Sequence, residues 1–448
     1  MLGWKILKEG DYKVSLPRLS DAEETMIEGV EERFREAARV REVKTRKESE
    51  ALIKDLLMAA SEEEGIMLEK DQLDYLSRAA FLHIYAFAFI DLLVADQDIE
   101  EISIIGINKP VYIYLKNKGW QSVNASFTSE RAIADVANKM ARGLGRHITM
   151  QNPRLDAMLP DGSRLHASLS PISNGEITIR KFRDRPFSPR ELYELHSTTA
   201  EALAFLSLVM QSDNSVLVGG NTGSGKTTLL NALFSFVPSD ERVLIAEETP
   251  EINIPHEHQL RLVANKDMDI SLKDLMYDTL RMRPDRMIVG EVRNKTEFEA
   301  LFDVILAGQA RGCYATLHSQ GSFEAAQRIK SFGINEMDIE SVDCIVIQRR
   351  MLLYDPKKRK NVEVRRMTEI AEMNKGPKLL FYFDRKSGKL KFRNGGKLLE
   401  KISSSFGMSK KEINSEIAMR QKLFKKLDME FNAFYSGVQD KLYGLGKK

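Results

Sequence analysis

The chain has 448 residues, 43% of them hydrophobic and 29% charged, which is typical of a globular protein. Its 67 basic and 65 acidic residues give a net charge of +2, which offers no global support for a protein that wraps nucleic acid. Its two cysteines, Cys313 and Cys344, are too few for a disulfide framework or a four-cysteine zinc site, so we expect a reducing compartment.

The N-terminal part of the chain predicts helices. Residues 18–109 contain no proline, and residues 21–77 are rich in Glu, Lys and Arg, as expected of helices with solvated polar faces. The first residues lack the apolar core of a signal peptide, and we expect none. The apolar run Ala79–Ile90 is too short to span a bilayer and predicts a buried helix.

Strand patterns follow. Residues 101–105 and 111–115 have strand-like apolar patterns, and the turn signal at 116–119 predicts a hairpin. Ser129–Leu144 predicts a helix with its first residue near the N-cap position. Ile177–Phe182 predicts another strand.

The pattern changes after a predicted linker. Arg183–Pro189 leads into a helix, with Ser188 as the N-cap and Pro189 at the first helical position. Strand-like and helical segments then alternate, which predicts a parallel sheet covered on both faces. The expected strands are 215–219, 242–246, 286–290, 313–317 and 344–348.

One loop carries a complete phosphate-binding motif. Gly220–Thr227 matches G-x-x-x-x-G-K-[ST] and lies between a predicted strand and a helical segment, 228–234. Its glycines let backbone N–H groups point at phosphate, and the helix N-terminus adds partial positive charge. The motif predicts binding of a nucleoside triphosphate with Mg²⁺. The expected binding residues are Gly220, Asn221, Thr222, Gly223, Ser224, Gly225, Lys226, Thr227 and Thr228.

Hydrolysis also needs acidic residues, and two acidic clusters follow predicted strands. They are Glu247–Glu251 and Gly290–Arg293, the latter containing Glu291. In an open α/β sheet the carboxyl ends of strands bind ligands, so this placement favours a catalytic role over solvated surface charge. A third strand ends at His318, where an imidazole could donate to a γ-phosphate.

Together these segments resemble the traffic ATPases of type II and type IV secretion, pilus and archaellum systems. Glu247–Glu251 is similar to that family's aspartate box. Arg281–Asp285 with Gly290–Arg293 is similar to its R-x-R-P-D segment and its atypical Walker B segment, in which glycine stands where most phosphate-loop ATPases carry aspartate. Residues 309–318 are similar to its histidine box.

The resemblance extends toward the N-terminus, over roughly residues 91–350. Leu155–Arg164 resembles the family's L-P-D-G-x-R segment, and residues 177–182 resemble its T-I-R-K-F segment. The T-I-R-K-F form of this segment resembles the form found in the archaeal, tight-adherence-pilus and conjugation-type branches of the family.

The resemblance implies roles for single residues. Lys226 and Thr227 would hold phosphates and Mg²⁺. Glu247 would polarise the attacking water, while Glu291 would order Mg²⁺, directly or through water, or order that water. The sequence leaves open which of the two glutamates activates water.

Three further roles follow from the same resemblance. His318 would sense the γ-phosphate. Arg164 and Arg180 would close over the nucleotide as arginine fingers. Arginines that arrive on domain closure stabilise charge that develops during phosphoryl transfer, which couples closure to hydrolysis.

The chain departs from the family pattern at three places. Glu248 stands where aspartate is usual, which lengthens that side chain by one methylene. Ala310 and Arg311 replace the usual Gly-His at the start of the histidine box. The four-cysteine zinc module of some type II secretion enzymes is absent, which argues against the standard bacterial type II branch.

Three other features of the sequence are less informative. Eight basic residues at 349–350, 357–360 and 365–366 favour a solvated hairpin tip over docking on an acidic loop or anionic lipid. His256 and His258 lack further ligands and are interpreted as structural. From Ile413 to residue 438, apolar spacing predicts one long amphipathic helix, which favours packing on its own chain over an intermolecular coil.

The predicted fold is α/β, with a RecA-like phosphate-loop core, a smaller mixed α/β N-terminal domain and a helical N-terminal region. The expected divisions are 1–90 (helical), 91–185 (mixed α/β), 186–370 (ATPase) and 371–448 (C-terminal hairpin and helix). We expect a Mg²⁺-dependent ATPase that forms a homohexamer in the cytoplasm. The resemblance implies peripheral attachment to the membrane through a polytopic inner-membrane platform protein.

Two alternatives remain open at this stage. A nucleic-acid translocase or packaging motor would need basic, aromatic-rich pore loops, but the charge balance suggests no specific nucleic acid. The second alternative is a scaffold protein that binds nucleotide but hydrolyses little of it. The departures from the family pattern at Glu248 and Arg311 leave this alternative open.

Overall fold

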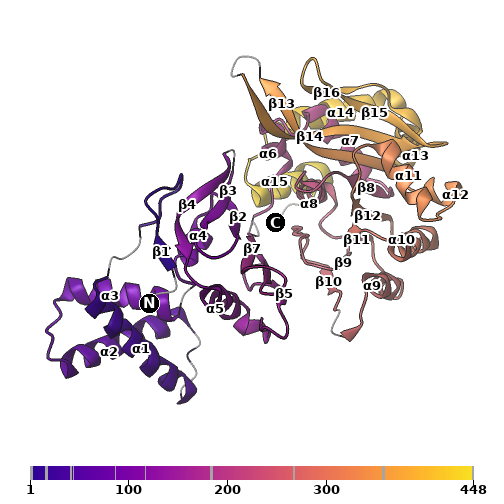
Figure 1. Cartoon of the computed structure of the whole chain (residues 1–448). Coiled ribbons are helices and arrows are strands. Elements are labelled where there is room, and N and C mark those ends of the chain that lie inside the picture. Colours follow the sequence, from indigo (N-terminus) through magenta and orange to yellow (C-terminus); the bar gives the residue numbers. More distant parts are fainter. Residues whose placement is uncertain are drawn as a thin grey trace. The chain divides into compact units, whose positions relative to one another are not determined.

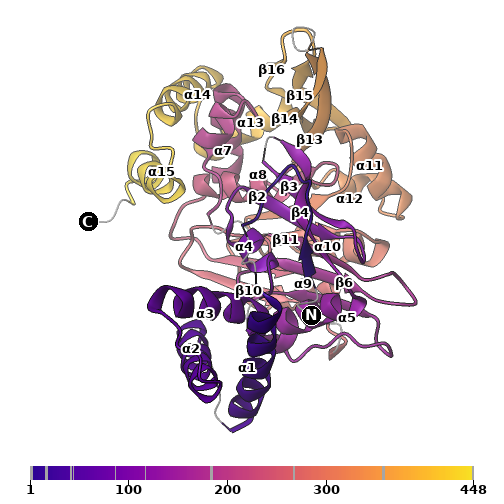
Figure 2. The same cartoon turned by 60° about the vertical axis from the view of Figure 1, so that its left-hand side comes forward.

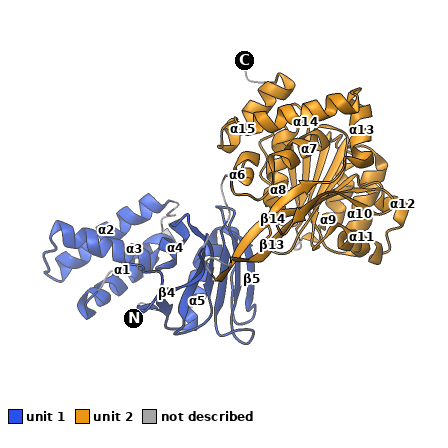
Figure 3. Ribbon diagram, turned by 90° about the horizontal axis from the view of Figure 1, so that it is seen from above, with its two compact units in different colours: residues 1–182 blue, residues 183–448 orange. Residues whose placement is uncertain are grey.

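The structure, a computed structural model, describes residues 4–15, 19–40, 43, 45–85, 87–116, 118–181, 185–265, 268–355 and 359–445. It forms two compact units, residues 1–182 and 183–448 (Figure 3). Within the described part, none of the helices combines the length and apolar character needed to cross a membrane. Some residues of the predicted features lie outside the described residues. They include Ala86, Asn117, Phe182, Arg183, Asp184, Lys357 and Lys358.

The charge-rich N-terminal segment is helical, as predicted. α1 (Asp21–Val40), α2 (Arg46–Glu63) and α3 (Lys70–Ile84) follow the short strand β1 (Trp4–Ile6) (Figure 1). The three helices share an apolar core in which Ile27, Ile53 and Leu57 are fully buried. Burial of one stripe on each helix stabilises them together, since isolated helices of this length are marginal in water.

The prediction of a single helix over Ala79–Ile90 is wrong. α3 ends at Ile84, and α4 (Ile90–Ala95) begins six residues later. Ala88 has a φ of +53°, a left-handed conformation that an α-helix cannot continue through. The segment is nevertheless largely buried, with Phe89 fully inside the neighbouring core.

The rest of unit 1 is an antiparallel sheet of seven strands in the order β1-β4-β3-β2-β7-β6-β5. Four of these strands, β2, β3, β4 and β6, are labelled in Figure 2. The hairpin and the helix predicted here are both present, and Ser129 caps the helix by accepting from the Ala132 N–H. The elements are β2 (Ile99–Ile104), β3 (Pro110–Leu115), β4 (Gly119–Phe127), α5 (Glu130–Ala141), a 3₁₀ turn (Arg142–Leu144), β5 (Arg154–Met158), β6 (Arg164–Ser168) and β7 (Glu176–Arg180).

Unit 2 is built on a sheet of nine strands in the order β10-β9-β11-β12-β8-β13-β14-β15-β16. The strands from β10 to β13 are parallel, and β14 to β16 extend the sheet as antiparallel neighbours. The strands are β8 (Val216–Gly219), β9 (Val243–Glu247), β10 (Gln259–Val263), β11 (Arg286–Val292), β12 (Gly312–Leu317), β13 (Cys344–Asp355), β14 (Lys360–Met373), β15 (Pro377–Asp384) and β16 (Lys389–Phe392).

Helices cover both faces of this sheet, which confirms the predicted α/β architecture with a phosphate-loop core. Val216 and Val218 point into the core under α7, α8 and the C-terminal helices, whereas Leu217 points into the core under α9 to α12. The helices are α6 (Pro189–Glu194), α7 (Ala200–Gln211), α8 (Lys226–Leu233), α9 (Leu272–Thr279), α10 (Lys295–Ala307), α11 (Ser322–Ser331), α12 (Glu336–Ile339) and α13 (Gly396–Phe406). The division into four domains stays a prediction.

The long C-terminal helix is instead two helices, α14 (Lys410–Phe424) and α15 (Phe431–Val438), followed by a π-helical turn (Gln439–Tyr443). Glu430 caps α15 by accepting from the Ala433 N–H, and Leu427 packs so closely on Gly437 that a Cβ there would lie 2.6 Å from it. The Glu430 cap and the packing of Leu427 on Gly437 favour a break between the two helices over one continuous helix.

The C-terminal helices pack on their own chain, as predicted. Phe424 stacks on Phe236 with ring centroids 4.8 Å apart. Arg420, which interrupts the apolar spacing, is buried and donates to Ser207 Oγ and Gln211 Oε1 of α7. A buried guanidinium with such partners fits an intramolecular interface.

Candidate nucleotide site

The phosphate-binding motif forms a tight turn between β8 and α8. Gly223 and Gly225 have φ angles of +70° and +94°, which only glycine adopts without strain. Gly219 and Gly220 have no room for a side chain, because a Cβ would lie 2.3 Å from Ser319 Oγ and 2.1 Å from the Gln348 carbonyl oxygen, respectively. These glycines keep the backbone N–H groups of the loop open to a ligand.

Sheet order brings the predicted acidic and histidine residues next to this loop. β9, β11, β12 and β8 are consecutive neighbours, and all four run parallel. Glu247 is the last residue of β9, Glu291 the last but one of β11, and His318 directly follows β12. The carboxyl ends of these strands therefore form one row with the loop after β8, as expected of an open α/β sheet.

Lys226, Glu291 and His318 form a compact charged cluster. Lys226 Nζ lies 3.4 Å from Glu291 Oε1 and 3.4 Å from His318 Nδ1, and His318 Nε2 lies 3.0 Å from the same Glu291 oxygen. Burial and the Lys226 charge lower the pKa of His318, partly offset by Glu291. The imidazole is therefore largely neutral at pH 7.

Glu247 is fully buried beside this cluster. Its Oε1 accepts from the backbone N–H groups of Glu251 and Ile252, at 2.8 and 2.9 Å. Its Oε2 lies 3.3 Å from Arg261 Nε, without the alignment of a hydrogen bond. Burial raises the pKa of Glu247 to about 7, although both N–H groups and Arg261 oppose the rise.

The two glutamates thus differ in charge behaviour. Burial also raises the pKa of Glu291, but Arg293, Lys226 and His318 outweigh it and hold that pKa below its ordinary value. Glu291 stays ionised near neutral pH, whereas Glu247 exchanges a proton there. Neighbouring carboxyls whose pKa values are pushed apart are suited to different tasks in one reaction.

Glu248, the first departure from the family pattern, belongs to the same charge network. Arg293 donates to Glu248 Oε2 at 2.6 Å and to Glu291 Oε2 at 2.7–2.8 Å. The guanidinium bridges the two acidic segments, so the longer side chain of Glu248 reaches a defined partner.

The Thr227 hydroxyl, expected to meet Mg²⁺, donates to Glu251 Oε2 at 3.0 Å. The site fits a Mg²⁺ nucleotide. Ser224 Oγ is buried without a hydrogen-bond partner in the described part of the chain, the Lys226 ammonium is nearly buried, and Thr227 and Glu291 supply the oxygen ligands that Mg²⁺ prefers.

Arg164 and Arg180 lie in unit 1. They begin β6 and end β7, and the register places them directly opposite each other on one face of the sheet. Like charges in that position repel, so the pair is an arrangement that an anion would stabilise. Arg164 and Arg180 belong to one unit, and the phosphate loop belongs to the other.

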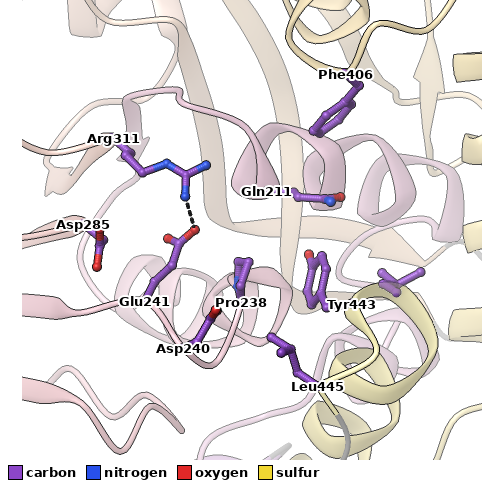
Figure 4. Close-up of a pocket in the computed structure, with 10 residues that line it drawn as sticks. Gln211, Pro238, Asp240, Glu241, Asp285, Arg311, Phe406, Tyr443 and Leu445 are labelled. Atoms are coloured by element: carbon purple, nitrogen blue, oxygen red, sulfur yellow. Dashed lines mark hydrogen bonds and ion pairs between the residues drawn. The ribbon is translucent and has the colours of Figure 1, made fainter.

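Arg311, the second departure, directly precedes β12, at the opposite end of this strand from His318. It pairs with Asp213 and Glu241 at the amino-terminal ends of the strands, where it lines a cavity of about 600 Å³ (Figure 4). The fully buried Arg286 also pairs with Glu241 and donates to Tyr314 Oη. Since this cavity is at the opposite edge of the sheet from the phosphate loop, it is not the nucleotide site.

His256 is structural, as interpreted from the sequence. It is buried, its Nε2 lies 3.1 Å from the Pro238 carbonyl oxygen, and burial lowers its pKa to about 4. His258 is exposed. No group of three or more His, Cys, Asp or Glu side chains that could hold a metal occurs among the described residues.

Sequence reasoning missed several contacts at the site. Glu251 and Arg293 stood in recognised segments but had no role assigned. Arg261 had no signal, and Arg350 was noted only as part of a basic hairpin tip. Their contacts to Glu247 and to the phosphate loop depend on sheet order and register.

The sequence is similar to a protein family and to several known proteins. Residues 89–380 match the family described as Type II/IV secretion system protein. Uncharacterized protein MJ0781 of Methanocaldococcus jannaschii is 34% identical over half of this chain but only 33% of its own length. VirB11 of Bartonella henselae is 26% identical over 61% of this chain and 93% of its own length.

The chain also resembles solved structures, with lower sequence identity. The VirB11 ATPase of the Brucella suis type IV secretion system is 20% identical, with a TM-score of 0.33, over 63% of this chain and 95% of that one. The pilus retraction motor PilT is 17% identical, with a TM-score of 0.46. The match covers 80% of this chain and 93% of the PilT chain. The assignment therefore rests on the family match, which covers well over half of the sequence. The chain belongs to the Type II/IV secretion system protein family.

Proposed function

We propose that the protein is an ATP-hydrolysing motor that acts as a hexamer and powers assembly or secretion by a type IV pilus, archaellum or type II/IV secretion machine. One observation carries the proposal. A complete phosphate loop lies beside two carboxyls with opposite pKa shifts, Glu247 and Glu291, at the ends of adjacent strands. Family membership supports it.

Each residue has a chemical task in this proposal. Glu247 accepts a proton from the attacking water, since a pKa near 7 suits a general base at neutral pH. Ionised Glu291 and the Thr227 hydroxyl would hold Mg²⁺, which would neutralise phosphate charge. Lys226 exchanges its contact with Glu291 for phosphate oxygens, and neutral His318 donates to the γ-phosphate.

The remaining parts of the proposal concern assembly. Arg164 and Arg180 would act as arginine fingers when the two units close on ATP, and this closure is the proposed working stroke. A polytopic membrane platform protein is the proposed partner, with the motor at the cytoplasmic face. Near-neutral net charge supports a protein partner rather than nucleic acid.

The test is Mg²⁺-dependent phosphate release by the purified protein, with and without DNA or lipid vesicles. Glu247→Gln, Glu291→Gln and Arg180→Ala should each lower kcat by about 10² or more. Full activity in all three variants would contradict the proposal. Strong stimulation by DNA would favour a translocase, and negligible turnover by the wild type would favour a nucleotide-gated scaffold.

A further inference from the structure

The part of β13 that contains Arg349 and Arg350 runs beside the phosphate loop. β13 pairs in parallel with β8 as far as Ile347 opposite Gly219, and then continues past the end of β8. The Gln348 carbonyl oxygen lies 2.1 Å from the position of a Cβ on Gly220. Residues 348–350 therefore lie alongside the phosphate loop, which directly follows β8.

Arg350 is fastened to this loop through its backbone. Its N–H donates to Asn221 Oδ1, and the Asn221 side-chain amide donates back to the Arg350 carbonyl oxygen, both at 2.9 Å. The guanidinium lies at the loop as well, because Arg350 Nη1 is 3.2 Å from the position of a Cβ on Gly223. A side-chain cation is thus held next to the middle of the phosphate-binding motif.

Arg350 has a basic and an acidic residue near it on β14. Arg350 lies directly opposite Arg365 of β14, and like charges in that position destabilise a strand pair. Glu363 lies two residues before Arg365, on the same face of β14. Its Oε2 pairs with Arg350 Nη2 at 2.7 Å. Both side chains of that ion pair are about one third exposed, so water and salt weaken it. The Arg350 guanidinium is therefore held beside the loop by an ion pair that water and salt already weaken.

We propose that Arg350 binds a phosphate of the nucleotide and exchanges its ion pair with Glu363 for that phosphate. The inference rests on the proposed function, because the ligand is the nucleotide of the same loop. A guanidinium matches phosphate geometry with two parallel hydrogen bonds, and phosphate carries more charge than the carboxylate it replaces. Nucleotide binding would thereby change the charge pairing of the β13–β14 hairpin.

The experiment measures ATP affinity of the full chain by calorimetry with Mg²⁺, before turnover becomes significant. Arg350→Gln should weaken ATP binding about tenfold, as expected for loss of charge-assisted hydrogen bonds. Glu363→Gln should strengthen it, because the competing carboxylate is gone. Arg359→Gln, which removes the same charge from the exposed turn of the same hairpin, should change the affinity less than twofold.

Opposite shifts in the Arg350 and Glu363 variants distinguish phosphate binding from a structural ion pair, whose two variants would both weaken binding. Equal weakening, or no change in Arg350→Gln, would overturn the inference. If Arg350→Gln does not fold, Arg350→Lys keeps the charge without the fork and should still weaken binding severalfold. No ATP binding by the wild type would instead overturn the proposed function.

Discussion

Glu247 packs directly against the backbone of Gly290. A Cβ on residue 290 would lie 3.0 Å from Glu247 Cγ and 3.4 Å from Glu247 Cβ. Gly290 thus has a steric role in this chain, since a larger residue would displace the proposed general base. The adjacent Thr316 hydroxyl donates to the Gly290 carbonyl oxygen at 2.6 Å, which leaves the backbone little freedom to move away.

Gly290→Ala should therefore reduce both stability and turnover. Overpacking in a closely packed core costs about 1–3 kcal/mol. We expect a lower melting temperature and at least a tenfold lower kcat for phosphate release, with little change in ATP affinity. Gly143→Ala is the matched control, because a Cβ there meets nothing within 4 Å. Wild-type turnover in Gly290→Ala would show that Glu247 does not need its observed position.

Glu247→Gln should alter stability in a pH-dependent way. The folded-state pKa of about 7 lies above the ordinary value of 4.5, so the wild-type protein loses stability as pH rises through this window. The glutamine variant does not titrate and avoids this loss, which amounts to about 1–3 kcal/mol. The melting temperature of the variant relative to wild type should be higher at pH 8 than at pH 5. An equal difference at both pH values would contradict the raised pKa.

Thr227→Val should uncouple nucleotide binding from Mg²⁺. The valine keeps the volume and β-branching of threonine but removes the hydroxyl that donates to Glu251 and is proposed to reach the metal. We expect Mg²⁺ to enhance ATP affinity in the wild type and in Thr227→Ser, but not in Thr227→Val. Calorimetry with Mg²⁺ and with EDTA measures this directly. Equal enhancement in all three proteins would remove Thr227 from the metal site.

Arg286 should be essential for the stability of unit 2. It is fully buried, and Glu241, its partner, is nearly so. Removing one member of a buried ion pair leaves the other charge uncompensated, at a cost of about 3–5 kcal/mol. Arg286→Met should lower the melting temperature strongly. Arg311→Met is the control, because the Arg311 side chain is half exposed and Glu241 keeps its buried partner, so the loss should stay within about 1 kcal/mol.

The sequence predicted most of the parallel core, because its signals are local. The phosphate-loop pattern, the strand-length apolar runs and the cap residues at Ser129 and Ser188 each depend on neighbouring positions. The acidic residues at strand ends could be placed together only because parallel strands share an edge.

Features that depend on tertiary packing escaped sequence reasoning. The break between α14 and α15 depends on Leu427 packing against Gly437. The break after Ile84 depends on a left-handed conformation at Ala88, a residue type with no sequence signal for it. The position of Arg350 depends on the register between β8 and β13, so its basic segment was interpreted as part of a solvated hairpin tip.

The most direct test measures ATP binding and phosphate release on the same preparations of three proteins. The wild type should bind ATP and release phosphate with Mg²⁺. Lys226→Ala should lose both activities, because the phosphate loop loses its cation. Glu247→Gln should bind ATP within a few fold of the wild type while phosphate release falls by about 10² or more. Wild-type rates of phosphate release in Glu247→Gln would contradict the account.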